Sequence, residues 1–169
     1  NPPFSMDYSS TVPEEQTILQ DYDLATYGGK QRTSLRSMVM FVERYCQLLK
    51  PGGRMFTVVD DGIVGGKKAG FVRDYIRENF IIRTIISLHG DAFQRSGARA
   101  KTTILGLIKR DTGDTSQPDA FVYESRYVGL DDVVPRTRAS VAEKARQEAA
   151  LEMQQILDAY ADYSAGKKG

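Results

Sequence analysis

Apolar residues in the middle of the chain recur with two different periods, which predict helices and strands in alternation. Steps of three and four predict amphipathic helices over residues 34–49 and from about 68 to 79. Short apolar runs predict buried strands over residues 55–59, 81–88 and 102–108. The apolar positions of the first helix are Leu35, Met38, Val42, Tyr45 and Leu49. This order of elements predicts an α/β fold.

The connections between these elements predict how the strands pair. The segment Lys50-Pro51-Gly52-Gly53 ends the first helix, because proline disfavours helical geometry before it and glycine accepts left-handed dihedral angles. A helix lies between the first two strands, so we expect a right-handed parallel crossover there. A glycine-containing loop over residues 90–100 joins the last two strands without a helix. We therefore expect these two strands to be antiparallel neighbours.

The two ends of the chain have different patterns. Residues 5–33 are mostly polar and turn-forming, which predicts a long loop. Residues 120–128 predict a short strand or an extended arm. Residues 140–163 predict a long helix with one apolar stripe, which favours docking on the same chain over an interface with another chain or segment. The stripe consists of Ala149, Met153, Ile156, Tyr160 and Tyr163.

The composition limits the classes of function that the 169 residues can have. With 41% hydrophobic and 27% charged residues, the chain is typical of a globular protein. One Cys and one His exclude an internal disulfide and the usual zinc sites, so we expect a reducing, cytoplasmic location. No apolar stretch approaches the roughly 20 residues that span a bilayer, so no membrane partner is expected. A net charge of +1 means that any nucleic-acid contact must be argued locally.

The first four residues, Asn1-Pro2-Pro3-Phe4, can solve a specific chemical problem. An aromatic amine is a poor nucleophile because its lone pair is delocalised into the ring, so catalysis needs acceptors that hold both N–H protons. The Asn1 side-chain oxygen is one acceptor, and the carbonyl of Pro2 is the other. The prolines restrict the backbone, and Phe4 offers a face on which a base can stack. Taken alone, the same residues also fit a polyproline-like turn at a chain end.

Five further segments follow the tetrapeptide in an order and spacing that resemble the N6-adenine DNA methyltransferases. The similarity is closest to the modification (M) subunit of type I restriction-modification systems and covers residues 1 to about 109. The segments are Phe41-Val42-Glu43-Arg44, Leu48-Leu49-Lys50-Pro51-Gly52-Gly53-Arg54-Met55, Asp61-Gly62-Ile63, Phe71-Val72-Arg73-Asp74-Tyr75-Ile76 and Lys101-Thr102-Thr103-Ile104-Leu105. The resemblance implies transfer of a methyl group from S-adenosylmethionine directly to N6 of a flipped-out adenine.

The resemblance also implies roles for individual residues. Asn1 and the Pro2 carbonyl would hold the amino group, Pro3 would stiffen the motif and Phe4 would stack on the adenine. Phe93 matches a position whose aromatic ring helps to enclose the base, although it could equally plug the end of the sheet. A cluster of three basic residues follows Phe93 in the sequence and contains no acidic residue. These side chains could bind DNA phosphates, or could simply be solvated charges on a loop. These residues are Arg95, Arg99 and Lys101.

The chain begins at the motif itself, so the resemblance implies the second half of a Rossmann-like class I methyltransferase sheet. The segment that binds S-adenosylmethionine is expected upstream of Asn1, and we expect the fragment by itself to be inactive. Expected partners are double-stranded DNA and restriction-modification subunits, and the truncated sheet edge favours self-association. The expected units are residues 1–111 for the catalytic half, 112–136 for a linker, 137–165 for the C-terminal helix and 166–169 for a tail.

Two alternatives remain open at this point. A methyltransferase acting on an RNA base or on a protein glutamine uses a similar Asn-Pro-Pro-aromatic motif, because an amide poses a similar problem. A non-catalytic assembly module would instead use the stripe on residues 140–163. Other chemistry is disfavoured: residues 62–68 lack the spacing of a phosphate loop, and the adjacent Asp60 and Asp61 should point apart.

Overall fold

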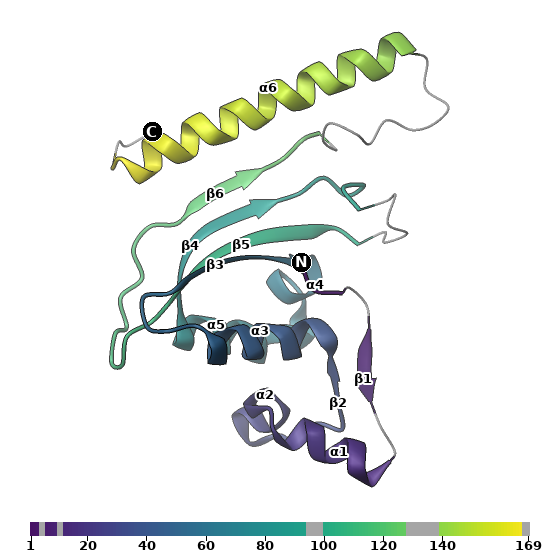
Figure 1. The fold of residues 1–169 in the computed structure, drawn as a ribbon, viewed down its shortest axis with the longest axis vertical. Helices are drawn as coiled ribbons and strands as arrows, with labels where there is room; N and C mark the ends of the chain where they lie inside the picture. The colour runs from purple at the N-terminus through teal and green to yellow at the C-terminus, as the bar shows by residue number, and fades with distance from the viewer. Residues whose placement is uncertain (4–5, 10–11, 94–99, 128–138, 167–169) are drawn as a thin grey trace.

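A computed structural model gives the fold of the 169-residue chain, and five short segments lie outside the part that it describes. These segments are residues 4–5, 10–11, 94–99, 128–138 and 167–169. The described part has three layers, which are visible in Figure 1: a pair of helices, a sheet, and one long helix on the other side of the sheet. A smaller unit at the N-terminal end packs beside the helix pair.

The main sheet has four strands in the order β3-β5-β4-β6. The central strand β5 (Thr102–Lys109) is antiparallel to β3 (Arg54–Asp60) and to β4 (Phe80–Ser87). Strand β6 (Phe121–Glu124) runs parallel to β4. The three main strands and the antiparallel β4–β5 pair are therefore confirmed. β3 and β4 run in the same direction as expected, but β5 lies between them.

Helices α3 (Ser37–Leu48) and α5 (Gly70–Asn79) cover one face of the sheet, as Figure 1 shows. Their apolar sides meet the buried faces of the strands to form the core, in which Val42, Val59 and Val72 are almost completely buried. The chain leaves α3 through Gly52, whose φ of 72° suits glycine, and the Gly52 N–H donates to the Lys109 carbonyl at 2.9 Å. Both predicted helices are confirmed.

The prediction of a long loop over residues 5–33 is wrong. This region contains β1 (Asp7–Ser9), α1 (Pro13–Gln20), α2 (Asp23–Thr26) and η1 (Tyr27–Gly29). β1 pairs with β2 (Ser34–Arg36) in a separate antiparallel ribbon. These elements are too short to show a period in the sequence, and tertiary contacts stabilise them. The buried Glu43 carboxylate accepts the N–H groups of Asp23 at 2.7 Å and Leu24 at 2.9 Å, at the start of α2.

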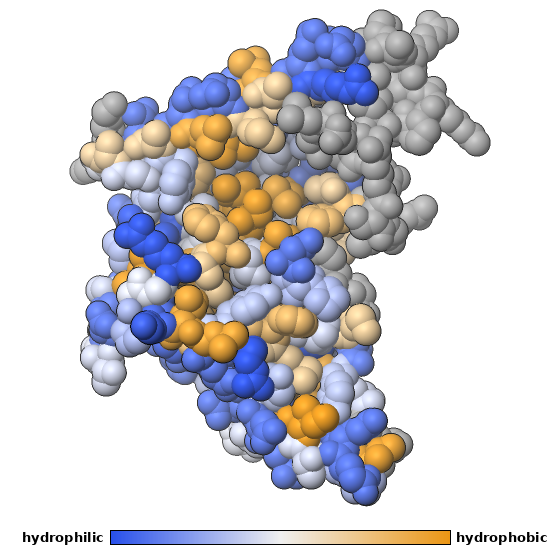
Figure 2. Space-filling view, viewed as in Figure 1, coloured by the Kyte–Doolittle hydropathy of each residue, from blue (hydrophilic) through white to orange (hydrophobic). Residues whose placement is uncertain are grey.

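The long helix α6 (Ala139–Ser164) lies over the opposite face, above β6 (Figure 1). The Tyr160 ring meets the Phe121 ring edge-on at 5.4 Å, and the Tyr163 hydroxyl donates to the Asp119 carbonyl at 2.7 Å. Figure 2 shows apolar surface between α6 and the strands and hydrophilic residues along the outer side of α6. The predicted docking on the same chain is therefore confirmed. Among the described residues, no helix has the length and apolar character needed to cross a membrane.

Glu152 anchors α6 to the strand end after β6. Its buried carboxylate accepts the Ser125 hydroxyl at 2.8 Å and the backbone N–H groups of Arg126 at 2.8 Å and Tyr127 at 3.2 Å. Glu152→Ala removes these bonds, so amide hydrogens of α6 should exchange about tenfold faster or more, which corresponds to about 1.4 kcal/mol. The control Glu148→Ala, one turn earlier on the same helix, should leave exchange nearly unchanged. Equal protection in both variants would contradict the anchoring role.

Candidate functional site

Strands β3 and β4 run in the same direction, so their carboxyl ends lie at the same end of the sheet. Ligands of open α/β sheets usually bind at this end. The N-terminus of the chain lies at this edge, beside the end of β3 and α4 (Asp61–Val64) (Figure 1). The Ser37 hydroxyl, at the start of α3, donates to the Pro3 carbonyl at 3.3 Å, and the Ser37 N–H donates to the Met6 carbonyl at 2.7 Å. Both contacts hold the N-terminal segment against the first turn of α3.

An ion pair connects the same corner to the end of β3. Arg36 precedes Ser37, and its guanidinium lies 2.9 Å from Oδ2 and 3.2 Å from Oδ1 of Asp60, the last residue of β3. The Asp60 side chain is only 8% exposed. Its Oδ2 receives no well-directed hydrogen bond in the described part of the chain, so charge attraction dominates that contact. A buried carboxylate with a charged partner positions the β2–α3 corner on the strand end.

Gly62 makes room for the Asp60 carboxylate. A Cβ at Gly62 would lie 2.6 Å from Asp60 Oδ1 and 3.2 Å from Arg36 Nη1. Gly62→Ala should therefore push the ion pair apart and lower the free energy of unfolding by about 1–3 kcal/mol, as overpacking does. Gly65→Ala, on the same short segment, is the matched control, because its Cβ would meet only the Asp61 carbonyl at 3.7 Å. Urea denaturation of both variants is the measurement, and equal stability would contradict the steric argument.

Asp61 faces a different partner from Asp60. The Thr103 hydroxyl donates to Asp61 Oδ1 at 2.9 Å, and the Asp61 N–H donates to the Lys101 carbonyl at 3.0 Å. The two carboxylates thus bind groups from different elements, as expected for adjacent residues at a strand end. They do not form a paired acid and base.

The first two residues differ in their exposure. Pro2 is buried and Asn1 is exposed, so the backbone is held while the amide side chain reaches solvent. Within the part of the chain that the structure describes, no hydrogen bond to the Asn1 side chain or to the Pro2 carbonyl is formed. Phe4, the predicted stacking residue, lies outside the described residues.

The other predicted site residues lie elsewhere or outside the description. Phe93 is half-buried and lines a cavity of about 370 Å³ whose opposite wall is α6, including Ala149 and Ile156. Neither Asn1 nor its neighbours line that cavity. Lys101 is exposed and pairs with Glu124 at 3.3 Å, so its charge has an acidic partner from β6. The other two basic residues, Arg95 and Arg99, lie outside the described residues.

A second cavity, of about 460 Å³, adjoins the Arg36 corner. It lies between the β2–α3 corner and the segment from α4 to α5, which includes η2 (Lys67–Ala69). Ile63 and Phe71 give it an apolar wall, and Lys67 gives it a positive rim. Nothing in the sequence pattern predicts that Arg36, Ser37 and Asp60 come together here, although Asp61-Gly62 beside them belongs to one of the family-like segments.

A family model described as N-6 DNA Methylase matches residues 1–167. The chain belongs to the N-6 DNA methylase family. The match covers the motif residues, the sheet and α6 together. No curated protein is similar enough in sequence to match this N-6 DNA methylase chain.

Solved structures share the fold at low sequence identity. A Listeria monocytogenes protein described as a class I S-adenosylmethionine-dependent methyltransferase is 21% identical, with a TM-score of 0.55 over 83% of this chain and 39% of that one. A chain from a study of type I R-M system assembly is 20% identical, with a TM-score of 0.58 over 99% of this chain and 30% of that one. A Vibrio vulnificus protein described as a type I modification subunit is 18% identical, with a TM-score of 0.52 over 81% and 25%.

These similarities show that this N-6 DNA methylase chain has the fold of the matching part of a class I S-adenosylmethionine-dependent methyltransferase. The chain spans less than two fifths of the length of each of the three structures. The glycines that follow β3, Gly62, Gly65 and Gly66, are not among the glycines with a positive φ. No group of side chains in the described part of the chain could hold a metal ion.

Proposed function

We propose that the chain is the second half of the catalytic domain of an adenine-specific DNA methyltransferase, with Asn1 and Pro2 as its amine-binding residues. The position of residues 1–3 at the carboxyl end of β3 supports this most strongly. The Ser37–Pro3 hydrogen bond and the Arg36–Asp60 ion pair connect them to the sheet edge. Membership of the N-6 DNA methylase family agrees with this assignment.

The proposed chemistry uses two acceptors that have no hydrogen-bond partner among the described residues, the Asn1 side-chain oxygen and the Pro2 carbonyl. An adenine amino group has two N–H protons, and the Asn1 side-chain oxygen and the Pro2 carbonyl each accept one. Holding both protons turns the nitrogen lone pair out of conjugation and towards an electrophile. Because Pro2 is buried and the Pro3 carbonyl is bonded to Ser37, the acceptors need little rearrangement when the base arrives. Phe4 would stack on the flipped base, which offsets part of the cost of unstacking.

S-adenosylmethionine would supply the electrophilic methyl group when bound. The described residues do not offer the glycine-rich turn expected for this cofactor, so we propose that it binds mainly to a segment upstream of Asn1. The 169 residues alone should then bind it weakly. Calorimetric titration that gave micromolar affinity for these residues would contradict this division of roles.

The proposed partners are double-stranded DNA and other subunits of a restriction-modification system. Among the described residues, strand β3 lies at one end of the sheet and pairs only with β5. In the proposed enzyme, the strand that leads into Asn1 would pair with this edge, because β3 has a free row of backbone groups there. For the isolated chain the same edge favours self-association, which light scattering would detect.

Transfer of a labelled methyl group tests the proposed function. The complete protein should be incubated with tritiated S-adenosylmethionine and, in separate reactions, duplex DNA, RNA and a glutamine-containing protein. Label in DNA adenine is the expected result. Label only in RNA or only in protein would replace the proposal with one of the alternative substrates, and label in none of them would overturn the assignment of the motif.

A further inference from the structure

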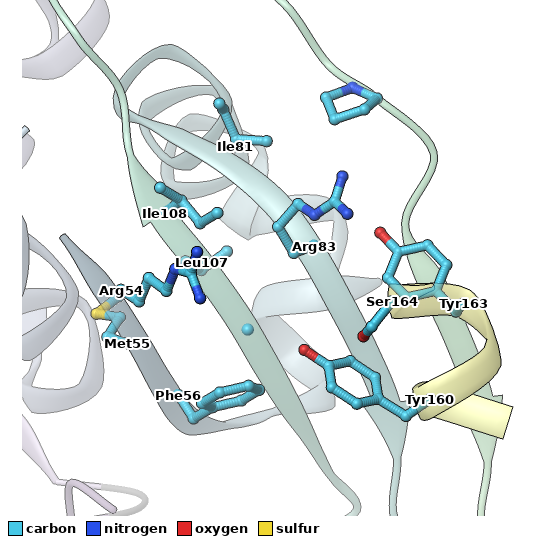
Figure 3. A pocket seen from close by; sticks show the side chains of 12 residues that line it. Arg54, Met55, Phe56, Ile81, Arg83, Leu107, Ile108, Tyr160, Tyr163 and Ser164 are labelled. Atoms are coloured by element: carbon cyan, nitrogen blue, oxygen red, sulfur yellow. The ribbon is translucent and has the colours of Figure 1, made fainter. Parts of the chain in front are cut away.

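A third cavity lies on the face of the sheet opposite to α3 and α5, far from Asn1. Along β3, Thr57 and Val59 are buried on the helix side, and the alternate residues Arg54 and Phe56 point to the other face and are exposed. Helix α6 lies above β6 on this face, at the side of the sheet away from β3 (Figure 1). A cavity of about 410 Å³ remains between the C-terminal end of α6 and the amino end of β3 (Figure 3).

The floor of this cavity is an aromatic ring laid flat against the sheet. Gly106 on β5 is the neighbour of Phe56, and a Cβ at Gly106 would lie 2.7 Å from Phe56 Cε1 and 2.8 Å from Thr84 Cβ. The absence of a side chain at Gly106 therefore allows the ring to lie over the strand. Phe56 remains 64% exposed, which makes it an open surface for a planar ligand.

Two arginines give the cavity a positive charge. Arg54 comes from β3 and Arg83 from β4, and Figure 3 shows both side chains beside the aromatic residues. Among the described residues, Arg83 contacts neutral groups: its guanidinium lies 5.1 Å above the Tyr163 ring and 3.5 Å from the Asp119 carbonyl. Neither arginine forms an ion pair within the described part of the chain, and the lining contains no acidic side chain. The cavity therefore favours an anion.

The wall formed by α6 adds polar groups. Tyr160 and Tyr163 face the strands across the cavity, and Ser164 ends the helix beside them (Figure 3). The Tyr163 hydroxyl is already bonded to Asp119, but the Tyr160 hydroxyl has no hydrogen-bond partner among the described residues. It is available to donate to, or accept from, a ligand.

We propose that this cavity binds a mononucleotide, with its base on the Phe56 ring and its phosphate between Arg54 and Arg83. A flat apolar floor favours a planar group. Two guanidinium groups in the lining favour a phosphate, because their planar arrangement of N–H donors matches the phosphate oxygens. A cavity of about 410 Å³ is within the range for small-molecule sites and has room for a base, a sugar and a phosphate together. The site uses the amino end of β3, so it is separate from the proposed amine-binding residues.

Calorimetry with the full chain tests this site, with AMP as the probe. AMP should bind. Adenosine and inorganic phosphate should each bind with an affinity lower by about tenfold or more, because each lacks one of the two recognised groups. Equal affinity for AMP and phosphate would indicate an adventitious anion contact and overturn the proposal. Binding of single-stranded DNA without any binding of AMP would also overturn it, since the site would then recognise a strand.

Substitutions locate the binding in the cavity. Arg54→Gln and Phe56→Leu, both at exposed positions, should each weaken AMP binding about tenfold, as expected for a lost charged hydrogen bond and a lost stacking surface. The control Arg77→Gln removes an arginine that is 63% exposed on α5, on the other side of the sheet. It should leave affinity unchanged. Circular dichroism should be identical for all three variants, and unchanged affinity in both cavity variants would refute the assignment.

Discussion

Asn1→Ala should lower the single-turnover rate of methyl transfer by the complete protein about 100- to 1000-fold, the range seen when one preorganised transition-state contact is removed. The side-chain oxygen of Asn1 is one of two acceptors proposed to hold the adenine amino group. Without it, one N–H proton is unpaired and the lone pair returns to the ring. The affinity for DNA should change little, because most of the binding energy comes from contacts with phosphates.

Two further variants make this result specific. Asn1→Asp keeps a side-chain acceptor and should retain a larger fraction of the rate than Asn1→Ala. Gln20→Ala removes an exposed amide at the end of α1 and should have the wild-type rate. Rapid-quench measurement with duplex DNA separates transfer from product release. If Asn1→Ala methylated adenine at the wild-type rate, the amine-holding role would have to be abandoned.

Glu43→Ala should destabilise the fold by about 3 kcal/mol, because it leaves two buried N–H groups without acceptors. The side chain is fully buried in α3, and its two oxygens accept the Asp23 and Leu24 N–H groups. The melting temperature should fall by about 10 °C for a chain of this size. Glu143→Ala, which removes an exposed carboxylate from α6, is the control and should change stability by less than about 0.5 kcal/mol.

The same residue predicts a dependence of stability on pH. Burial raises the pKa of the Glu43 carboxyl above its ordinary value of 4.5, and the N–H groups of Leu24 and Asp23 oppose this shift only in part. The folded state therefore holds the proton more tightly than the unfolded state. Stability should fall as the pH rises from 4.5 through the raised pKa, in contrast to the usual behaviour of ion-paired carboxylates.

Comparison with Glu43→Gln isolates this contribution. The glutamine variant cannot ionise at that position, so the difference in unfolding free energy between the two proteins should change with pH only across this window. Urea denaturation at several pH values from 4.5 to 7 gives the difference directly. A difference that stayed constant, or that favoured the glutamate at higher pH, would contradict the raised pKa.

Much of the α/β layer followed from local pattern. The three-and-four spacing of Leu35 to Leu49 and the short apolar runs marked α3, β3, β4 and β5, because each of these elements has one face or two faces buried in a single core. The antiparallel pairing of β4 with β5 followed from the missing helix between them. The position of β5 between β3 and β4 could not be predicted from the sequence, since pairing partners depend on which strand edges are free and not on the order of the strands along the chain.

The N-terminal region shows where local pattern fails. Residues 5–33 contain four short elements, and no side-chain cap within the segment explains α2. Glu43, about 20 positions further along, supplies the acceptors instead. Similarly, Asp60 and Arg36 are 24 residues apart, and only the fold brings them together. A contact of that separation leaves no periodic signal in the sequence.

The sequence by itself determined the family, because a four-residue motif and five spaced segments are specific in combination, and it determined the helices and strands that have a continuous apolar face. The tertiary structure alone decided which groups surround the motif: the Ser37 hydroxyl, the Arg36–Asp60 pair and the space left by Gly62. It also decided that α6 leaves part of the sheet uncovered, with Phe56 and two arginines facing the gap. Burial of one face of a helix or strand gives a periodic pattern of apolar residues in the sequence. Ion pairs, steric gaps and cavities depend instead on how close the fold brings residues that are far apart in the sequence.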